Sequence, residues 1–112
     1  MASNAARSWR AAAPVFAALG DETRLRLVAR LCDGGPQSIS KLTEGAEVTR
    51  QAITKHLHVL EEAGLVRGVR EGRESVWELE TRRLEEAKKT LELISKRWDD
   101  AIDRLRAFVE EE

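Results

Sequence analysis

The sequence predicts a mainly α-helical fold with one small β-hairpin and a long C-terminal helix. Three observations support this fold class. Apolar residues recur every three or four positions before Gly64, which is the spacing of one helix face. The spacing changes to two over residues 65–79. It returns to three and four from Thr81 onward, where the chain has no glycine or proline.

The composition is that of a soluble globular protein, with 35% charged and 42% hydrophobic residues. The length suits one domain (1–112), which we divide into a core over residues 8–80 and a C-terminal helix over residues 81–112. No apolar run approaches the roughly 20 residues of a membrane span, and the N-terminus lacks the unbroken apolar core of a secretory signal. We therefore expect a cytoplasmic protein without membrane association. Cys32 is the only cysteine, which excludes an intrachain disulfide.

Two helices are expected before Gly34. After a frayed start over residues 1–7, the first helix should end near Leu19, because apolar residues recur at helical spacing up to that point. Pro14 fits best if the helix starts there, since proline is tolerated in a first turn. Asp21 is the expected N-cap of the second helix. The predicted buried stripe of that helix, with the cysteine as a small core residue, consists of Leu25, Val28, Leu31 and Cys32.

A helix-turn-helix is expected next. Ser38 begins a short third helix with Ile39 and Leu42 facing inward, and residues 45–48 form a turn. Thr49 is a good N-cap for the following helix, because its hydroxyl can accept a hydrogen bond from an unpaired amide of the first turn. Two helices joined by so short a turn form a helix-turn-helix, in which the second is the recognition helix.

The recognition helix has two chemically different faces. Ile53, Leu57 and Leu60 line the inward face, and Gly64 ends the helix in left-handed backbone. The outward face offers an amide, a hydroxyl, an ammonium and an imidazole, from Gln51, Thr54, Lys55 and His58. These groups pair with base edges and phosphates in a DNA major groove. The alternative is an ordinary surface helix with a solvated polar face.

A β-hairpin follows, with strands over residues 65–70 and 74–79 and Gly72 in the turn. Its three arginines are Arg67, Arg70 and Arg73. Such a hairpin is either simply solvated or a wing whose arginines contact DNA. We favour the wing, because the hairpin directly follows a helix-turn-helix.

The last helix carries a heptad seam that so small a core cannot cover. Its apolar positions alternate in steps of three and four, at Leu84, Ala87, Leu91, Ile94, Trp98, Ala101, Leu105 and Phe108. A helix of about 30 residues runs about 45 Å. The surplus apolar surface predicts a partner helix, most simply the same helix of a second subunit.

The net charge of −1 argues mildly against a nucleic-acid partner, and residues 37–79 hold six Lys or Arg against seven Glu. However, only charges near the phosphates contribute to counterion release, so the placement of the cations matters more than their sum. The near-neutral charge keeps a second hypothesis open. In that hypothesis the chain is a winged-helix module that binds protein without specific DNA binding.

Two strings resemble those of the ArsR-like winged helix-turn-helix repressors. Residues 16–24, FAALGDETR, are similar to the family's F-x-A-L-x-D-x-T-R opening. Residues 54–66, TKHLHVLEEAGLV, are similar to its S-K-H-L-x-x-L-x-x-A-G-L-V string. The resemblance spans roughly Phe16 to Leu79. It implies a dimeric transcriptional repressor that places the second helix of the motif in the major groove and dimerises through its terminal helices.

The metal-binding motifs of that family are missing. Where arsenic- and cadmium-sensing members carry Cys-x-Cys, this chain has Ser38 and Ser40, and its last helix has no histidine for the zinc site of another branch. We therefore expect no metal and no cofactor. The sequence also shows no Ser–His–Asp set and no glycine-rich phosphate loop, so we expect no enzymatic activity.

Together these features predict a homodimeric, sequence-specific regulator that binds double-stranded DNA and represses transcription by occupying a pseudo-palindromic operator. His56, at the edge of the apolar face, is expected to be a hydrogen-bonded structural residue. The predicted DNA-binding residues are Lys41, Thr49, Arg50, Gln51, Thr54, Lys55, His58, Arg70 and Arg73. The predicted dimer interface consists of Trp9, Phe16, Leu91, Ile94, Trp98, Ala101, Leu105 and Phe108.

Overall fold

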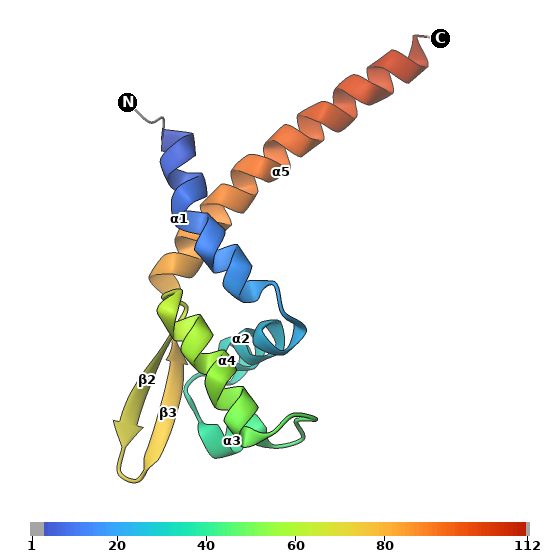
Figure 1. Cartoon of the computed structure of the whole chain (residues 1–112). Coiled ribbons are helices and arrows are strands. Elements are labelled where there is room, and N and C mark those ends of the chain that lie inside the picture. The colour runs from blue at the N-terminus through green and yellow to red at the C-terminus, as the bar shows by residue number, and fades with distance from the viewer. Residues whose placement is uncertain (1–3, 112) are drawn as a thin grey trace.

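The structure is a computed structural model that describes the backbone of residues 4–111 and the side chains of residues 9–111. Its described part is mainly helical, with a small antiparallel sheet and a long last helix (Figure 1), and this confirms the predicted fold class. In chain order the elements are α1 (Asn4–Leu19), α2 (Glu22–Gly34), β1 (Gln37–Ser38), α3 (Ile39–Thr43), α4 (Arg50–Glu62), β2 (Val66–Glu71), β3 (Glu74–Leu79) and α5 (Thr81–Glu110).

The elements form a packed body from which one helix projects. Helices α2, α3 and α4 lie together, with the β2–β3 hairpin beside them, and α5 runs past α1 and away from the body toward the C-terminus (Figure 1). The principal extents of 66 × 36 × 20 Å reflect this projection. Much of α5 therefore lies outside the reach of the core.

Side-chain caps start three of the helices, and the caps at Asp21 and Thr49 were predicted. Asp21 Oδ2 accepts from the Arg24 amide at 3.0 Å, and Ser38 Oγ accepts from the Lys41 amide at 3.1 Å. Thr49 Oγ1 accepts from the Ala52 amide at 3.1 Å. Each bond satisfies an amide that has no partner inside its own helix. The short side chain of Thr49 thus fixes where the recognition helix α4 begins.

The core is mainly aliphatic and is centred on the inward face of α4. The predicted inward residues Ile53, Leu57 and Leu60 have exposed fractions of 2%, 0% and 0%. They pack with residues from the other helices and the sheet, among them Leu27, Leu31, Leu42, Leu65 and Trp77. After α4 the chain reverses at Gly64, whose φ of 77° lies in the left-handed region that glycine tolerates best.

The sheet has one strand more than the sequence predicted. The hairpin pairs Arg67 with Glu78 and closes at Gly72, which has a φ of 60°. The additional strand β1 pairs Gln37 with Trp77, so the strand order is β1-β3-β2. A strand of two residues is too short to show a periodicity of its own, which is why sequence reasoning missed it.

The predicted stripe of α2 was wrong in two of its four positions. The buried residues are Leu27, Val28 and Leu31, whereas Leu25 is 51% exposed and Cys32 is exposed. The predicted stripe and the observed buried residues both fit a helical spacing, because α2 carries apolar residues on two faces. Only the packing of α2 against the rest of the core selects between them. Cys32 is therefore a surface thiol and not a core residue.

The predicted start of the first helix was also wrong. Helix α1 begins at Asn4, so residues 4–7 are helical, and residues 1–3 lie outside the described part of the chain. Pro14 stands inside α1 and costs it one backbone hydrogen bond, because proline has no amide proton. Pro14 and Arg10 are both exposed, so water can reach the Arg10 carbonyl that loses its partner.

Two adjacent substitutions test which face of α2 is buried. Leu31→Ala should lower the free energy of unfolding by about 2–5 kcal/mol, because it removes a side chain that is only 2% exposed. Cys32→Ser should change it by less than about 0.5 kcal/mol, because the thiol is exposed. Urea unfolding followed by circular dichroism measures both values. Equal losses from the two variants would contradict this assignment.

Candidate nucleic-acid interface

The outward face of α4 is a polar surface supported by a rigid core. Arg50, Gln51, Lys55 and His58 are exposed, and Thr54 is half-buried. The Thr54 hydroxyl donates to the Arg50 carbonyl at 3.0 Å, so its oxygen lone pairs remain for a ligand. Because the opposite face of α4 is buried, these side chains cannot turn inward. The structure thus brings the predicted α4 contact residues onto one surface.

Cations without ion pairs lie on α4 and on the neighbouring α3 and hairpin. Within the described residues, no ion pair involves any of the predicted cationic contacts, which are Lys41 on α3, Arg50 and Lys55 on α4, Arg70 on β2 and Arg73 in the hairpin turn. All five side chains are exposed. Their charges are therefore free for phosphates. Whether each of them contacts DNA remains a prediction.

Arg67, the third arginine of the predicted wing, behaves differently. Its Nε donates to Glu78 Oε1 at 3.0 Å, and its Nη1 lies 3.4 Å from Glu80 Oε1. The hydrogen bond to Glu78, followed by the charges of Glu78 and Glu80, raises the pKa of Arg67. The Arg67 side chain is 59% exposed, but Glu78 and Glu80 of the same chain balance its charge, so the DNA role that the sequence suggested for Arg67 is not supported. Only Arg70 and Arg73 are left as free wing arginines.

The hairpin is attached to the recognition helix through a contact that sequence reasoning did not foresee. Glu61 Oε2 accepts from the Gly68 amide at 3.2 Å, which joins the end of α4 to β2. The ring of His58 meets Trp77 edge to face at 5.6 Å between centroids, and His58 Nδ1 lies 3.4 Å from Glu61 Oε1. Its side chain is still 59% exposed, so its predicted DNA contact stays open.

Gly68 was the sequence signal for this packing. A Cβ atom at Gly68 would lie 3.1 Å from Trp77 Cη2, closer than most real contacts. A glycine inside a strand often marks a site where another group approaches the backbone closely. Here the approaching group is the buried indole of Trp77, which holds the hairpin against the core.

His56 points away from the outward polar face of α4 toward the start of α2, and it is hydrogen-bonded, as predicted. Its Nδ1 lies 3.2 Å from Arg24 Nη1 and 3.8 Å from Asp21 Oδ2. The Nε of Arg24 donates to the carbonyl of Ala18 at the end of α1. The hydrogen bond from the Arg24 amide lowers the pKa of Asp21, and the nearby His56 and Arg24 lower it further.

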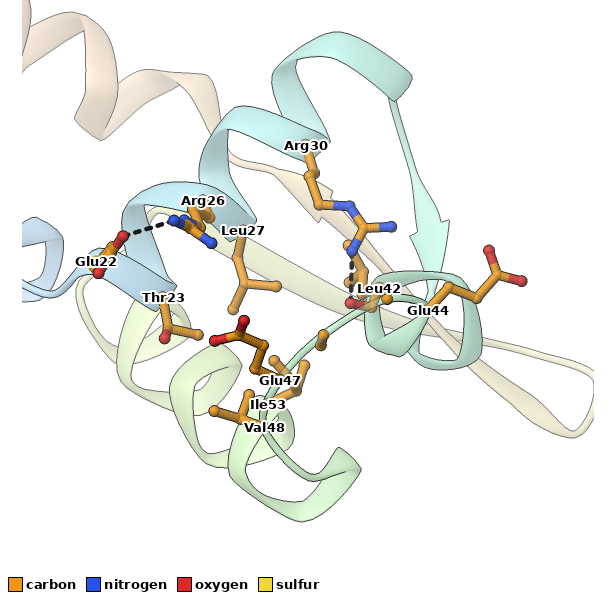
Figure 2. Close-up of a pocket in the computed structure, with 12 residues that line it drawn as sticks. Glu22, Thr23, Arg26, Leu27, Arg30, Leu42, Glu44, Glu47, Val48 and Ile53 are labelled. Carbon is orange, nitrogen blue, oxygen red and sulfur yellow. Dashed lines mark hydrogen bonds and ion pairs between the residues drawn. The ribbon is translucent and has the colours of Figure 1, made fainter.

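A cavity of about 360 Å³ separates α2 from the turn that leads into α4 (Figure 2). Arg30 bridges this gap, because its Nη1 donates to the Leu42 carbonyl at 2.8 Å and its Nη2 donates to the Lys41 carbonyl at 2.7 Å. Both carbonyls lie at the end of α3, where the Lys41 carbonyl also accepts from the Glu44 amide at 3.2 Å. Figure 2 shows Glu47 in the turn below Leu27. Arg30 thus holds the end of α3, where the turn toward α4 begins, to α2.

The predicted dimer residues form an apolar surface on α5. Leu91, Trp98, Leu105 and Phe108 are 52%, 66%, 63% and 66% exposed, and Ile94 is 39% exposed. A shallow groove on this face is lined by Ile94, Arg97, Trp98, Ala101, Ile102 and Leu105. Of the two predicted residues on α1, Trp9 lies under the guanidinium of Arg97 at 5.2 Å, and Phe16 is half-buried against the core.

Two other properties of the described residues bear on function. Residues 4–111 contain no helix that is long and apolar enough to cross a membrane. The same part of the chain has no group of three or more His, Cys, Asp or Glu residues placed to hold a metal ion.

Comparisons with known proteins point to one family. A sequence profile described as "Helix-turn-helix domain" matches residues 19–69. The Bacillus subtilis protein named "Uncharacterized HTH-type transcriptional regulator YuzN" is 42% identical over 65 residues, which are 53% of this chain and 71% of YuzN. The "Arsenical resistance operon repressor" of the same organism is 36% identical over 64 residues, covering 57% of this chain and 61% of the repressor.

A solved structure extends the similarity to most of the fold. The "ArsR-like Transcriptional Regulator from Rhodococcus sp. RHA1" is 38% identical to this chain and superimposes with a TM-score of 0.70. The match covers 89% of this chain and 93% of the Rhodococcus chain. The common part therefore includes much of the long last helix as well as the helix-turn-helix.

Proposed function

Because this chain belongs to the ArsR-like family of winged helix-turn-helix transcriptional regulators, we propose that it is a homodimeric repressor that occupies a pseudo-palindromic operator in double-stranded DNA. The observation that carries the proposal is the exposed polar face of α4, which lies opposite a buried apolar face. Cations without ion pairs lie on α4 itself, on α3 and on the hairpin. We place its action in the cytoplasm, and we expect neither a metal nor an enzymatic activity to be involved.

The α4 side chains supply two kinds of contact in this proposal. Gln51 carries an amide that can pair with adenine N6 and N7 in the major groove, and such bidentate pairs distinguish one base from another. Arg50 and Lys55 carry charges that suit phosphates or guanine, and Thr49 and Thr54 add hydroxyls. Lys41 on α3, with Arg70 and Arg73 on the hairpin, would contact the backbone on either side and fix the register of α4.

The apolar face of α5 supports the proposed homodimer. Only Ala87 and Thr90 of α5 are buried in a single chain, although the heptad seam continues to Phe108. A second copy of the same helix is the simplest surface that matches this seam, because a two-fold interface uses one patch twice. Trp98, which is 66% exposed, is the expected anchor. Two subunits would then offer two recognition helices to successive major grooves, about 34–36 Å apart.

Two substitutions separate base recognition from backbone contact. Gln51→Ala should relax base preference at one position per half-site, at a cost of about 1–3 kcal/mol in binding. Arg73→Ala should weaken binding to all sequences similarly and reduce the salt slope by about one unit. Fluorescence anisotropy with a panel of single-base operator variants at several salt concentrations measures both effects.

The reverse result, in which Arg73→Ala changes base preference and Gln51→Ala does not, would overturn these assignments. The salt titration also tests the alternative hypothesis of a protein-binding module. A wild-type protein that bound duplex DNA without a steep dependence on salt would favour that alternative.

Dimerisation should be required for operator binding. The double variant Trp98→Ala with Leu105→Ala removes two exposed anchors of the seam, so it should sediment as a monomer and lose operator binding. Its fold should persist, because neither residue is buried in the single chain. The matched control is Lys96→Ala with Asp103→Ala on the opposite face of α5, which should remain dimeric. A folded monomer that bound the operator with full affinity would contradict the proposal.

A further inference from the structure

A polar cluster joins three helices at one point, and the proposed DNA contacts make no use of it. His56 comes from α4, Asp21 and Arg24 come from the start of α2, and the Ala18 carbonyl comes from the end of α1. The side chains of His56 and Asp21 are 24% and 37% exposed. Because α1 packs along α5, the cluster connects the recognition helix to the helix that bears the apolar seam.

One ring nitrogen of His56 determines the state of this cluster. His56 Nδ1 lies 3.2 Å from Arg24 Nη1 and 3.8 Å from Asp21 Oδ2. A guanidinium can only donate, so the contact with Arg24 is a hydrogen bond only while Nδ1 carries no proton. A proton on Nδ1 would place two donors against each other. It would also draw the ring toward Asp21, whose Oδ2 already accepts from the Arg24 amide.

We propose that His56 is a positioning residue for DNA binding. Its unprotonated Nδ1 accepts a hydrogen bond from Arg24, and Arg24 in turn bonds the end of α1. These contacts keep α4 in a fixed orientation relative to α1 and α5. The proposal rests on the proposed function, because it concerns how the recognition helix is presented to DNA. The groups that face the ring are Asp21 and Arg24 from α2, with the Ala18 carbonyl of α1 beyond Arg24. Protonation of His56 breaks the hydrogen bond between Nδ1 and Arg24, and so weakens DNA binding as the pH falls.

The orientation of α4 affects operator binding because the operator has two half-sites at a fixed spacing. Two recognition helices can enter successive major grooves only if each is held at a set angle to the dimer axis. Apolar burial is non-directional, whereas the hydrogen bonds at the α1–α2 corner require a set orientation of the groups that they join. Arg24 makes that contact by bonding His56 and Ala18 with different nitrogens of one rigid guanidinium.

The chain contains only two histidines, so their contributions can be separated. His56→Asn retains an acceptor near the position of Nδ1 but cannot gain a proton. The His58→Asn variant serves as the background, because protonated His58 would favour phosphate contact and so oppose the effect of His56. Since His58 is itself a predicted DNA contact, each variant is compared with its own affinity at pH 8. The probe is a duplex that the wild-type protein enriches from random sequence at pH 8. Its affinity is measured by anisotropy between about pH 5.5 and 8, where histidine changes charge.

In the His58→Asn background, affinity should fall by about tenfold on acidification to pH 5.5, the scale of one charge-assisted hydrogen bond. Adding His56→Asn should keep the affinity at pH 8 within about threefold and reduce the acid loss to less than about twofold. An acid loss that persists in the double variant would overturn the proposal. So would a double variant that is equally weak at every pH, because that result indicates a purely structural role.

Ring ¹⁵N shifts of His56 in the free wild-type protein test the contact without DNA. An unprotonated Nδ1 with the proton on Nε2 is expected at pH 8, and the opposite tautomer would overturn the proposal. These measurements distinguish a failure of the proposed function from a failure of the His56 proposal. If no duplex is enriched, the proposed function fails and this proposal fails with it. If a duplex is bound and its pH response does not depend on His56, only this proposal fails.

Discussion

Burial of one face of α4 is the interaction on which the rest of the structure depends. Ile53, Leu57 and Leu60 are at most 2% exposed, and they fix α4 against the other helices and the sheet. With that face committed to the core, the polar face of α4 must point outward. The hairpin then follows directly, because Gly64 turns the chain from the end of α4 into β2. Core, recognition surface and wing are thus consequences of a single amphipathic helix.

The apolar seam of α5 is connected to this arrangement through α1. Within one chain only Ala87 and Thr90 of α5 are buried, and the exposed remainder of its apolar seam is the surface that we propose for dimerisation. Helix α1 packs along α5 and ends at the corner where Arg24 bonds both the Ala18 carbonyl and His56. The surface proposed for dimerisation and the surface proposed for DNA are therefore joined by direct contacts, which links subunit geometry to groove recognition.

The features that could be predicted from sequence are those that local chemistry determines. The Thr49 cap, the inward face of α4 and the glycine turns depend on neighbours within a few residues. The misassigned Leu25 depended instead on which of two apolar faces the core selects. The pairing of Arg67 with Glu78 across the hairpin, and the packing of Trp77 against Gly68, required a register that spacing alone does not give.

The distance between the two recognition helices in solution tests the central claim most directly. A spin label can be attached through Val59→Cys, an exposed α4 position outside the predicted contacts, in a Cys32→Ser background that removes the only native cysteine. Pulsed dipolar spectroscopy on the protein bound to its duplex should then give one distance distribution centred at about 34–36 Å, the spacing of successive major grooves. The absence of dipolar coupling, or a distribution well below that spacing, would contradict the account.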